Sequence, residues 1–247
     1  DPAGWGAAVS DSAPGLRSYP APMVTRPASP TAWASQPRES VPIADGYTVG
    51  RLLAEEQVQR GVRRVGAKLG FTNQMVWSEL GLSTPFWSPI YDTAVTDTRS
   101  VSLAGLVQPR IEPEIILGFD TELPAGATLE AISAAIGWGV AGCEIVQCHY
   151  PRWEMEPADA IADAGLHALL VVGERIEMDP VSARAMADVE VELWQAGTVV
   201  SSGRGSHALG GAVRAAAWQL RMPGVDGICA GAIVPPGTPT TPYPLPP

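Results

Sequence analysis

The sequence contains almost no lysine. Lys68 is the only lysine among 247 residues, whereas arginine supplies 15 of the 16 basic side chains. Because the chain uses arginine nearly everywhere else, we interpret this lysine as one whose chemistry arginine does not supply, with chance as the alternative. A lysine is a compact point charge that can lose its proton when desolvated, and arginine is neither. Lys68 also lies between Gly66 and Gly70, and glycines let a ligand or another strand approach closely.

Positive charge and cysteine are both scarce. The formal net charge is -10 at pH 7, and an acidic surface repels phosphate backbones and anionic lipids, so we expect neither nucleic acid nor a membrane as partner. No apolar run reaches the length of a transmembrane helix, and we expect no signal peptide from the first residues. The three cysteines, Cys143, Cys148 and Cys229, form no CxxC motif. This argues against a disulfide framework and a structural zinc site, and we expect a cytoplasmic protein.

Three common catalytic motifs are also absent. The chain has no GxSxG nucleophile elbow, no phosphate-binding P-loop and no GxGxxG that opens a helix. These absences argue against the corresponding hydrolases, nucleotide hydrolases and dinucleotide-dependent enzymes.

The pattern of apolar residues predicts an irregular, Pro- and Ala-rich arm over residues 1–41 and a single catalytic domain over residues 42–247. Leu52, Leu53 and Val58 are expected to face the core from a helix that begins at Asp45. The expected helices cover 45–61, 73–80, 128–138 and 209–220, and the expected strands cover 63–71, 110–119, 142–147, 166–173, 189–194, 198–201 and 232–235. Residues 83–100 and 149–163 are expected to be irregular. Because strands and helices do not alternate regularly, the predicted class is α+β, built around a curved mixed sheet or β-roll with flanking helices.

Two carboxylates mark the strand expected at 110–119. Glu112 and Glu114 are two residues apart, so both side chains project from the same face of a strand. Adjacent carboxylates repel each other unless a cation or a proton lies between them. Glu144 lies on another predicted strand, and three carboxylates would suit a hard cation, Mg²⁺ or Mn²⁺. A solvated strand face is the alternative interpretation of the same spacing.

His167 is a second candidate, because it interrupts the apolar run 166–172. A histidine in such a run is usually a hydrogen-bonded core residue, and a functional role is the alternative. Trp87 and Trp153 fall in segments predicted to be irregular and are candidates to line a pocket.

Six segments, taken in order, are similar to one known family. They are residues 65–82 (VGAKLGFTNQMVWSELGL), 109–117 (PRIEPEIIL), 142–146 (GCEIV), 162–173, 203–218 and 237–245 (GTPTTPYPL). The chain resembles the 2-keto-4-pentenoate hydratase and 4-oxalocrotonate decarboxylase family of the fumarylacetoacetate hydrolase superfamily. The resemblance implies the β-roll of that superfamily's catalytic domain, usually assembled as a homo-oligomer and in some members paired with a paralogue.

The resemblance also implies roles for particular residues. Glu112, Glu114 and Glu144 would bind Mg²⁺ or Mn²⁺, and Lys68 would lie beside a 2-oxo or 2-hydroxydienoic acid. The turn at Gly237 and Thr238 would contact the carboxylate or oxo end of that substrate.

The chain departs from the family pattern at two places. Residues 83–88 read STPFWS, and Phe86 stands where family hydratases carry an aspartate. Residues 162–166 read ADAGL in place of ADNAS, which keeps Asp163 and is followed by His167. His167 is therefore a candidate for the proton transfer, with Asp92 as another. Phe86, Trp87 and Tyr91 are expected to form an apolar wall around the substrate tail.

These observations predict a metal-dependent lyase that hydrates or decarboxylates a small 2-oxo acid through a stabilised enolate. One alternative is a hydrolase of the C–C bond of an acylpyruvate, which needs a water activated by His167 with Asp163 or Glu144. Another alternative is a catalytically weak paralogue that serves as an oligomeric partner.

The lone lysine yields a direct test. We predict that Lys68→Arg preserves folding and metal binding but lowers turnover by ~10²–10⁴-fold, the typical contribution of one such group. Arginine keeps the charge, but its planar group is bulkier and does not release a proton. Turnover is measured side by side for both proteins on a 2-oxo acid that exchanges hydrogen at C3. A ratio near one would show an ordinary lysine, since an isolated exposed charge contributes ~0–1 kcal/mol.

Overall fold

The computed structural model describes residues 5–8, 42–74, 77–80, 82–98 and 100–245. Its main element is a nine-stranded mixed sheet in which seven strands follow the order β3-β2-β13-β5-β7-β8-β4, while β14 pairs with β5 and β9 pairs with β7. These strands are β2 (Arg64–Gly70), β3 (Phe86–Tyr91), β4 (Val95–Thr96), β5 (Arg110–Phe119), β7 (Ile136–Val146), β8 (His167–Val172), β9 (Ile176–Glu177), β13 (Ile233–Val234) and β14 (Tyr243–Pro244).

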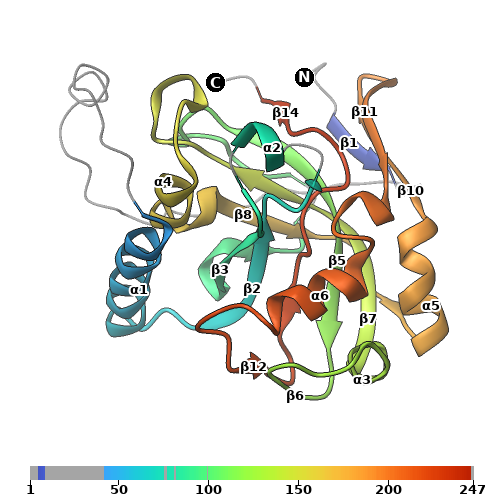
Figure 1. Ribbon diagram of the computed structural model, residues 1–247. Coiled ribbons are helices and arrows are strands. Elements are labelled where there is room, and N and C mark those ends of the chain that lie inside the picture. Colours follow the sequence, from blue (N-terminus) through green and yellow to red (C-terminus); the bar gives the residue numbers. More distant parts are fainter. Residues whose placement is uncertain (1–4, 9–41, 75–76, 81, 99, 246–247) are drawn as a thin grey trace.

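Within the described part of the chain, two small sheets and six α-helices surround the main sheet (Figure 1). The small sheets contain β1 (Trp5–Ala8), β10 (Glu190–Gln195) and β11 (Thr198–Arg204), and β6 (Leu123–Pro124) with β12 (Gly227–Ile228). The helices are α1 (Ile43–Gln59), α2 (Trp77–Leu80), α3 (Leu129–Ala135), α4 (Pro157–Ala162), α5 (Pro180–Ala185) and α6 (Ala212–Gln219). Within the described residues no helix is long and apolar enough to cross a membrane.

The main sheet curls until it is nearly a closed barrel. Strands β2 and β7 are separated in the sheet by β13 and β5, yet the side chains of Lys68 on β2 and Glu144 on β7 are in contact. Only a strongly curved sheet brings these side chains together across its concave face. The predicted α+β class with a curved sheet of the β-roll type is therefore confirmed.

Strand β5 shows how the barrel separates two environments. Ile115, Leu117 and Phe119 alternate toward the outside, where they pack in one buried cluster with residues of α3, α5 and α6. Ile116 lies on the opposite face, in an apolar cluster with residues of β3, β7, β8 and β13. Glu112 and Glu114 share the face of Ile116, so the period of the strand carries both carboxylates into the barrel.

Several predicted elements are confirmed. The strand expected at 110–119 is β5, and the hairpin expected after residue 189 is formed by β10 and β11. Thr128 caps α3 as expected, because its side chain accepts a hydrogen bond from the N–H of Ala131.

The prediction of an irregular segment over residues 83–100 is wrong, because this segment contains β3 and β4. Pro85 and Pro89 favoured a loop prediction, since proline lacks the N–H that a strand donates. Strand β3 lies at the edge of the sheet, where a residue without an N–H is tolerated.

Three other expectations that concern helices also differ from the structure. The helix expected to run to residue 138 ends at Ala135, because β7 begins at Ile136 and pairs with β5. The irregular segment expected at 149–163 contains α4, whose Pro157 occupies the first helical turn. Helix α1 buries Gly46, whereas Leu52 and Val58 are exposed and do not face the core. Within the expected irregular arm, residues 5–8 form β1 beside β10, and residues 9–41 lie outside the described residues.

Candidate metal and acid–base site

Three carboxylates meet at one end of the barrel. Glu112 on β5 lies directly opposite Glu144 on the neighbouring β7, and Glu114 follows two residues later on the same face. One carboxylate oxygen from each residue lies within 4.8 Å of the others. Glu114 and Glu144 are fully buried, whereas Glu112 is partly exposed. The site is therefore open toward solvent on the Glu112 side.

The hydrogen bonds around the carboxylates leave two buried oxygens without a partner. Oε1 of Glu114 and Oε2 of Glu144 have none among the described residues. A buried, unpaired carboxylate oxygen is costly unless a cation or a hydrogen-bond donor compensates it. The residues present thus fit a hard cation held by oxygen ligands.

The pKa shifts of the three glutamates also favour a cation site. Burial, together with the negative charge of Glu144, raises the pKa of Glu112 to about 7. Burial and the charges of Glu144 and Glu112 raise the pKa of Glu114 well above its usual value. Burial also acts on Glu144, but the charge of Lys68 and the hydrogen bond from His167 outweigh it and leave its pKa lowered. Glu144 is therefore the firmly ionised member, whereas for Glu112 and Glu114 the nearby positive charges do not outweigh burial and carboxylate repulsion.

Lys68 is buried against Glu144, with 2.6 Å between Nζ and Oε1. Burial is the largest single influence and acts to lower the pKa of Lys68, but the charges of Glu144, Glu112 and Glu114 together with the hydrogen bond to Glu144 outweigh it, and the pKa is raised. Lys68 therefore carries a positive charge in this arrangement. The shift is opposite to the one that a proton relay by Lys68 requires.

His167 approaches the same oxygen from β8. Its Nδ1 lies 2.8 Å from Oε1 of Glu144, and its ring is buried. A carboxylate only accepts hydrogen bonds, so Nδ1 carries the hydrogen. In a neutral ring Nε2 is then an acceptor, and Nε2 is buried without a partner among the described residues. In its neutral form, His167 would therefore present the Nε2 lone pair next to the carboxylates.

Asp163 and Asp92 do not join this group. The Asp163 carboxylate is hydrogen-bonded to His149, with 2.7 Å between Oδ1 and Nδ1, and the Asp92 carboxylate accepts a hydrogen bond from the N–H of Arg63. Of the two partners considered for His167, the structure has Glu144 and not Asp163. The sequence pattern gave no indication of the His149–Asp163 pair, whose members are 14 residues apart in an apparently irregular segment.

The turn at Gly237 lies against the carboxylates. The N–H of Gly237 donates to Oε2 of Glu114 at 2.9 Å. Gly237 has φ +101°, and a Cβ at this position would lie 2.0 Å from Oγ1 of Thr72, so only glycine fits. Thr238 is bonded to Thr240 through its hydroxyl group.

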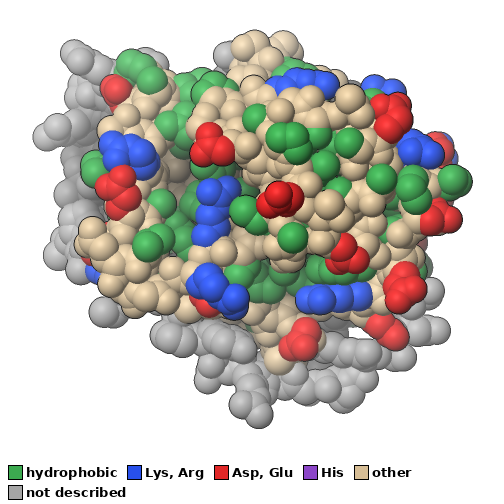
Figure 2. Space-filling view, turned by 90° about the horizontal axis from the view of Figure 1, so that it is seen from below, with side chains coloured by type: hydrophobic (Ala, Val, Ile, Leu, Met, Phe, Trp, Pro, Cys, Tyr) green, Lys and Arg blue, Asp and Glu red, His purple; other side chains and the backbone are tan. Residues whose placement is uncertain are grey.

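Phe86 and Trp87 point to opposite faces of β3. Lys68 lies opposite Ser88 in the β2–β3 pair, so Phe86 shares the face of Lys68, and Trp87 lies on the other face. Trp87, together with residues of α1, lines an outer groove of about 970 Å³, which is seen in Figure 2 as a hollow lined by hydrophobic side chains. Phe86, Trp87 and Tyr91 all line this groove, although Phe86 also lies on the sheet face that carries Lys68; that these aromatic side chains surround a substrate tail stays a prediction.

In comparisons with known proteins, the chain is similar to hydratases and decarboxylases of one family. No protein-family model matches it. It is 31% identical over 187 residues to a 2-keto-4-pentenoate hydratase of Paraburkholderia phymatum, which covers 73% of this chain and 70% of the relative. It is 28% identical over 208 residues to a 4-oxalocrotonate decarboxylase of a Pseudomonas species, with 79% and 76% covered. The structure superposes on the 4-oxalocrotonate decarboxylase of Pseudomonas putida G7, complexed with magnesium and adipate, with a TM-score of 0.77, 24% identity and 84% and 80% covered.

The crowding of carboxylates predicts a stability effect. Without divalent cations, Glu114→Gln should raise the melting temperature, because it removes one buried member of three mutually repelling carboxylates and keeps an oxygen for the N–H of Gly237. A gain of ~1 kcal/mol corresponds to ~2–4 °C in a domain of this size.

Thermal unfolding in excess EDTA measures this effect, with the exposed Glu174→Gln as the matched control that leaves the melting temperature unchanged. A variant that melts below wild type would show that the protein alone stabilises the ionised Glu114.

Proposed function

This chain belongs to the 2-keto-4-pentenoate hydratase and 4-oxalocrotonate decarboxylase family, and we propose that it is a divalent-cation-dependent lyase of a small 2-oxo acid or 2-hydroxydienoate. The supporting observation is the cluster of Glu112, Glu114 and Glu144, in which two buried oxygens lack partners and one is shared by Lys68 and His167. The reaction is hydration or decarboxylation.

The three glutamates would hold the cation. Carboxylate oxygens suit Mg²⁺ or Mn²⁺, and the magnesium in the solved P. putida decarboxylase supports this choice. When bound, such a cation acts as a Lewis acid that polarises a 2-oxo group and stabilises the negative charge of an enolate.

Lys68 would bind the negative end of the substrate. Its ammonium group is charged and buried beside the carboxylates, where water does not screen it strongly. It can donate to a substrate carboxylate or to the oxygen on which enolate charge develops, while Glu144 keeps it in position. The role proposed for Lys68 is electrostatic, since its ammonium group lies 2.6 Å from Oε1 of Glu144 and can stabilise negative charge on the substrate.

His167 would move the proton. Glu144 accepts the Nδ1 hydrogen and so leaves the Nε2 lone pair free. Nε2 can take a proton from C3 of a 2-oxo acid as the enolate forms and return it when the enolate is protonated on carbon. This assigns to His167 the acid–base role of the aspartate that Phe86 replaces.

Phe86 and the turn at Gly237 and Thr238 would shape the rest of the pocket. Phe86 presents an apolar ring on the face of Lys68, suited to a hydrocarbon tail. The turn packs against Glu114, within reach of the carboxylate or oxo end of a substrate that binds there.

Hydrolysis of a C–C bond in an acylpyruvate is the second candidate. That reaction needs a water activated by a histidine–carboxylate pair, and His167 with Glu144 is such a pair with Nε2 free. Product analysis separates the three reactions: decarboxylation releases CO₂, hydration gives a 4-hydroxy-2-oxo acid, and hydrolysis gives two carboxylic acids.

A third candidate is a catalytically weak subunit beside an active paralogue, because Phe86 replaces an acidic residue of the family. We also propose a homo-oligomer, alone or with such a paralogue, and light scattering after size exclusion measures its mass. Enolisation by the isolated chain distinguishes an enzyme from a weak partner.

The test of the proposed function is hydrogen–deuterium exchange at C3 of a panel of 2-oxo acids, followed by NMR. We expect exchange that requires Mg²⁺ or Mn²⁺ and stops with EDTA. Glu114→Gln should abolish exchange and weaken metal binding in a calorimetric titration, because a hard cation loses one of three negative ligands. The control Glu174→Gln should match wild type in both measurements. Equal metal affinity in Glu114→Gln and wild type would reject the proposed metal site.

For His167 we predict that His167→Gln lowers kcat by at least ~10²-fold with a small change in KM. The glutamine amide can still donate to Glu144, so the fold keeps that hydrogen bond but loses the base. Steady-state kinetics and thermal unfolding are compared with those of wild type. A histidine that only packs in the core would show the reverse: a lower melting temperature and an unchanged kcat for the folded fraction.

A further inference from the structure

The backbone just before His167 is strained. Ala164, Gly165 and Leu166 have φ angles of +52°, +67° and +63°. Three consecutive residues in the left-handed region are unusual, and the conformation is unfavourable for alanine and leucine because their Cβ atoms crowd the backbone. Such a turn persists only where its surroundings hold it in place.

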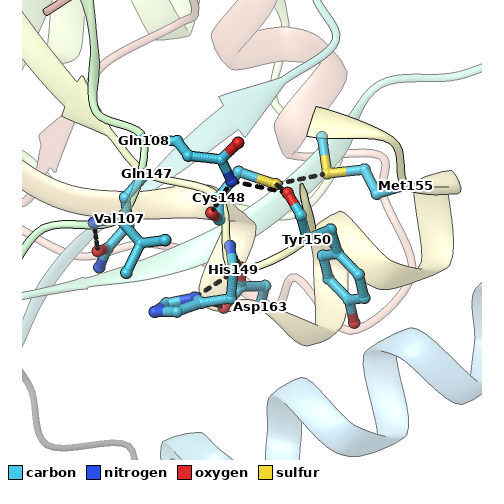
Figure 3. Close-up of polar contacts among 8 residues, drawn as sticks. All are labelled: Val107, Gln108, Gln147, Cys148, His149, Tyr150, Met155 and Asp163. Carbon is cyan, nitrogen blue, oxygen red and sulfur yellow. Dashed lines mark hydrogen bonds and ion pairs between the residues drawn. The ribbon is translucent and has the colours of Figure 1, made fainter. Parts of the chain in front are cut away.

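A side-chain clamp holds the start of this turn. Nδ1 of His149 lies 2.7 and 2.9 Å from the two carboxylate oxygens of Asp163, and the N–H of His149 donates to Oδ2 at 3.3 Å (Figure 3). The Asp163 carbonyl accepts the N–H of Leu166 at 2.8 Å, and the Leu166 carbonyl accepts the N–H of Gln147 at 2.9 Å. The turn is thus tied to the segment that leaves β7, the strand that carries Glu144.

The segment that carries His149 is itself fixed. Nε2 of Gln108 donates to the carbonyls of Cys148 and Tyr150, each at 2.8 Å, on both sides of His149 (Figure 3). The N–H of Val107 donates to the side chain of Gln147 at 3.2 Å. His149 therefore holds Asp163 from a backbone with little freedom to move.

The other side of the turn is packed against β3. A Cβ on Gly165 would lie 2.6 Å from Cβ of Ser88 and 3.1 Å from the ring of Phe86. The turn therefore lies in contact with β3 on the face of Lys68 and leads directly into His167. A small shift of the turn would move Nδ1 of His167 away from Oε1 of Glu144, to which it is now bonded at 2.8 Å.

We propose that His149 and Asp163 are positioning residues that hold the left-handed turn at 164–166 and so set the place of the His167 ring against Glu144. This inference rests on the proposed function of His167. It assigns Asp163 a role different from the one considered above, a partner of His167 in activating a water, because both of its carboxylate oxygens are hydrogen-bonded to His149. His149 acts from outside the carboxylate cluster, through Asp163.

The test uses the full chain with Mg²⁺ and a substrate that shows C3 exchange. His149→Ala and Asp163→Ala should lower kcat by ~10²-fold, the order expected when a catalytic group is misplaced by about 1 Å. KM and the Mg²⁺ affinity should stay near wild type. His149→Arg should restore most of kcat, because a guanidinium group can bind the Asp163 carboxylate with two hydrogen bonds. The control Glu154→Gln, an exposed substitution in the same segment, should match wild type.

A double-mutant cycle connects the clamp with His167. In a His167→Gln background, adding His149→Ala should cause no further loss of kcat, because the group that the clamp positions is already gone. Losses that multiply would overturn the inference, as would a wild-type kcat in His149→Ala. If Asp163→Ala does not fold, His149→Ala and its arginine rescue carry the test alone. If His167→Gln itself keeps full activity, the proposed role of His167 fails, and this outcome is distinct from a failure of the clamp.

Discussion

The site depends on one carboxylate oxygen that accepts two hydrogen bonds. Oε1 of Glu144 accepts from Lys68 and His167, and these contacts keep Glu144 ionised despite its burial. The second oxygen, Oε2, is buried and has no hydrogen-bond partner among the described residues, in a carboxylate that lies beside those of Glu112 and Glu114. The arrangement stores unbalanced negative charge in the interior, and a cation is the natural counterpart of such a charge.

Apolar packing on both faces of the barrel stabilises the fold despite the repulsion among the carboxylates. Below the carboxylates, its interior is filled by an apolar cluster that includes Ile116, Val140 and Leu170, while an outer cluster packs the helices against β5. The sheet is therefore held together by apolar packing on both faces and does not rely on its charged end. A protein organised in this way can tolerate electrostatic repulsion at a site that serves chemistry.

The local sequence pattern predicted those features of the site that are set within a single strand. The two-residue spacing of Glu112 and Glu114 placed them on one face, and the lone Lys68 was marked by composition. The closure of the barrel, which brings Lys68 to Glu144, comes from pairing between strands far apart in the sequence and has no local pattern. The same holds for β3, whose prolines are acceptable only because the strand lies at an edge, and for His149, whose partner lies on another element. Glu144 was a candidate third ligand from its predicted strand, and the family resemblance strengthened that grouping; the register of β5 against β7 provides the physical reason.

The burial of Lys68 has a consequence for the protein's surface. The only lysine of the chain lies inside the barrel with 3% of its surface exposed, so the folded protein offers no lysine side chain to acetylating or other amine-modifying enzymes. A protease specific for lysine has a single peptide bond to cut, the one after Lys68, and that bond lies within β2 between β3 and β13. Cleavage at this position would therefore report that the barrel has opened, and its rate would measure the stability of the strand that carries the lysine.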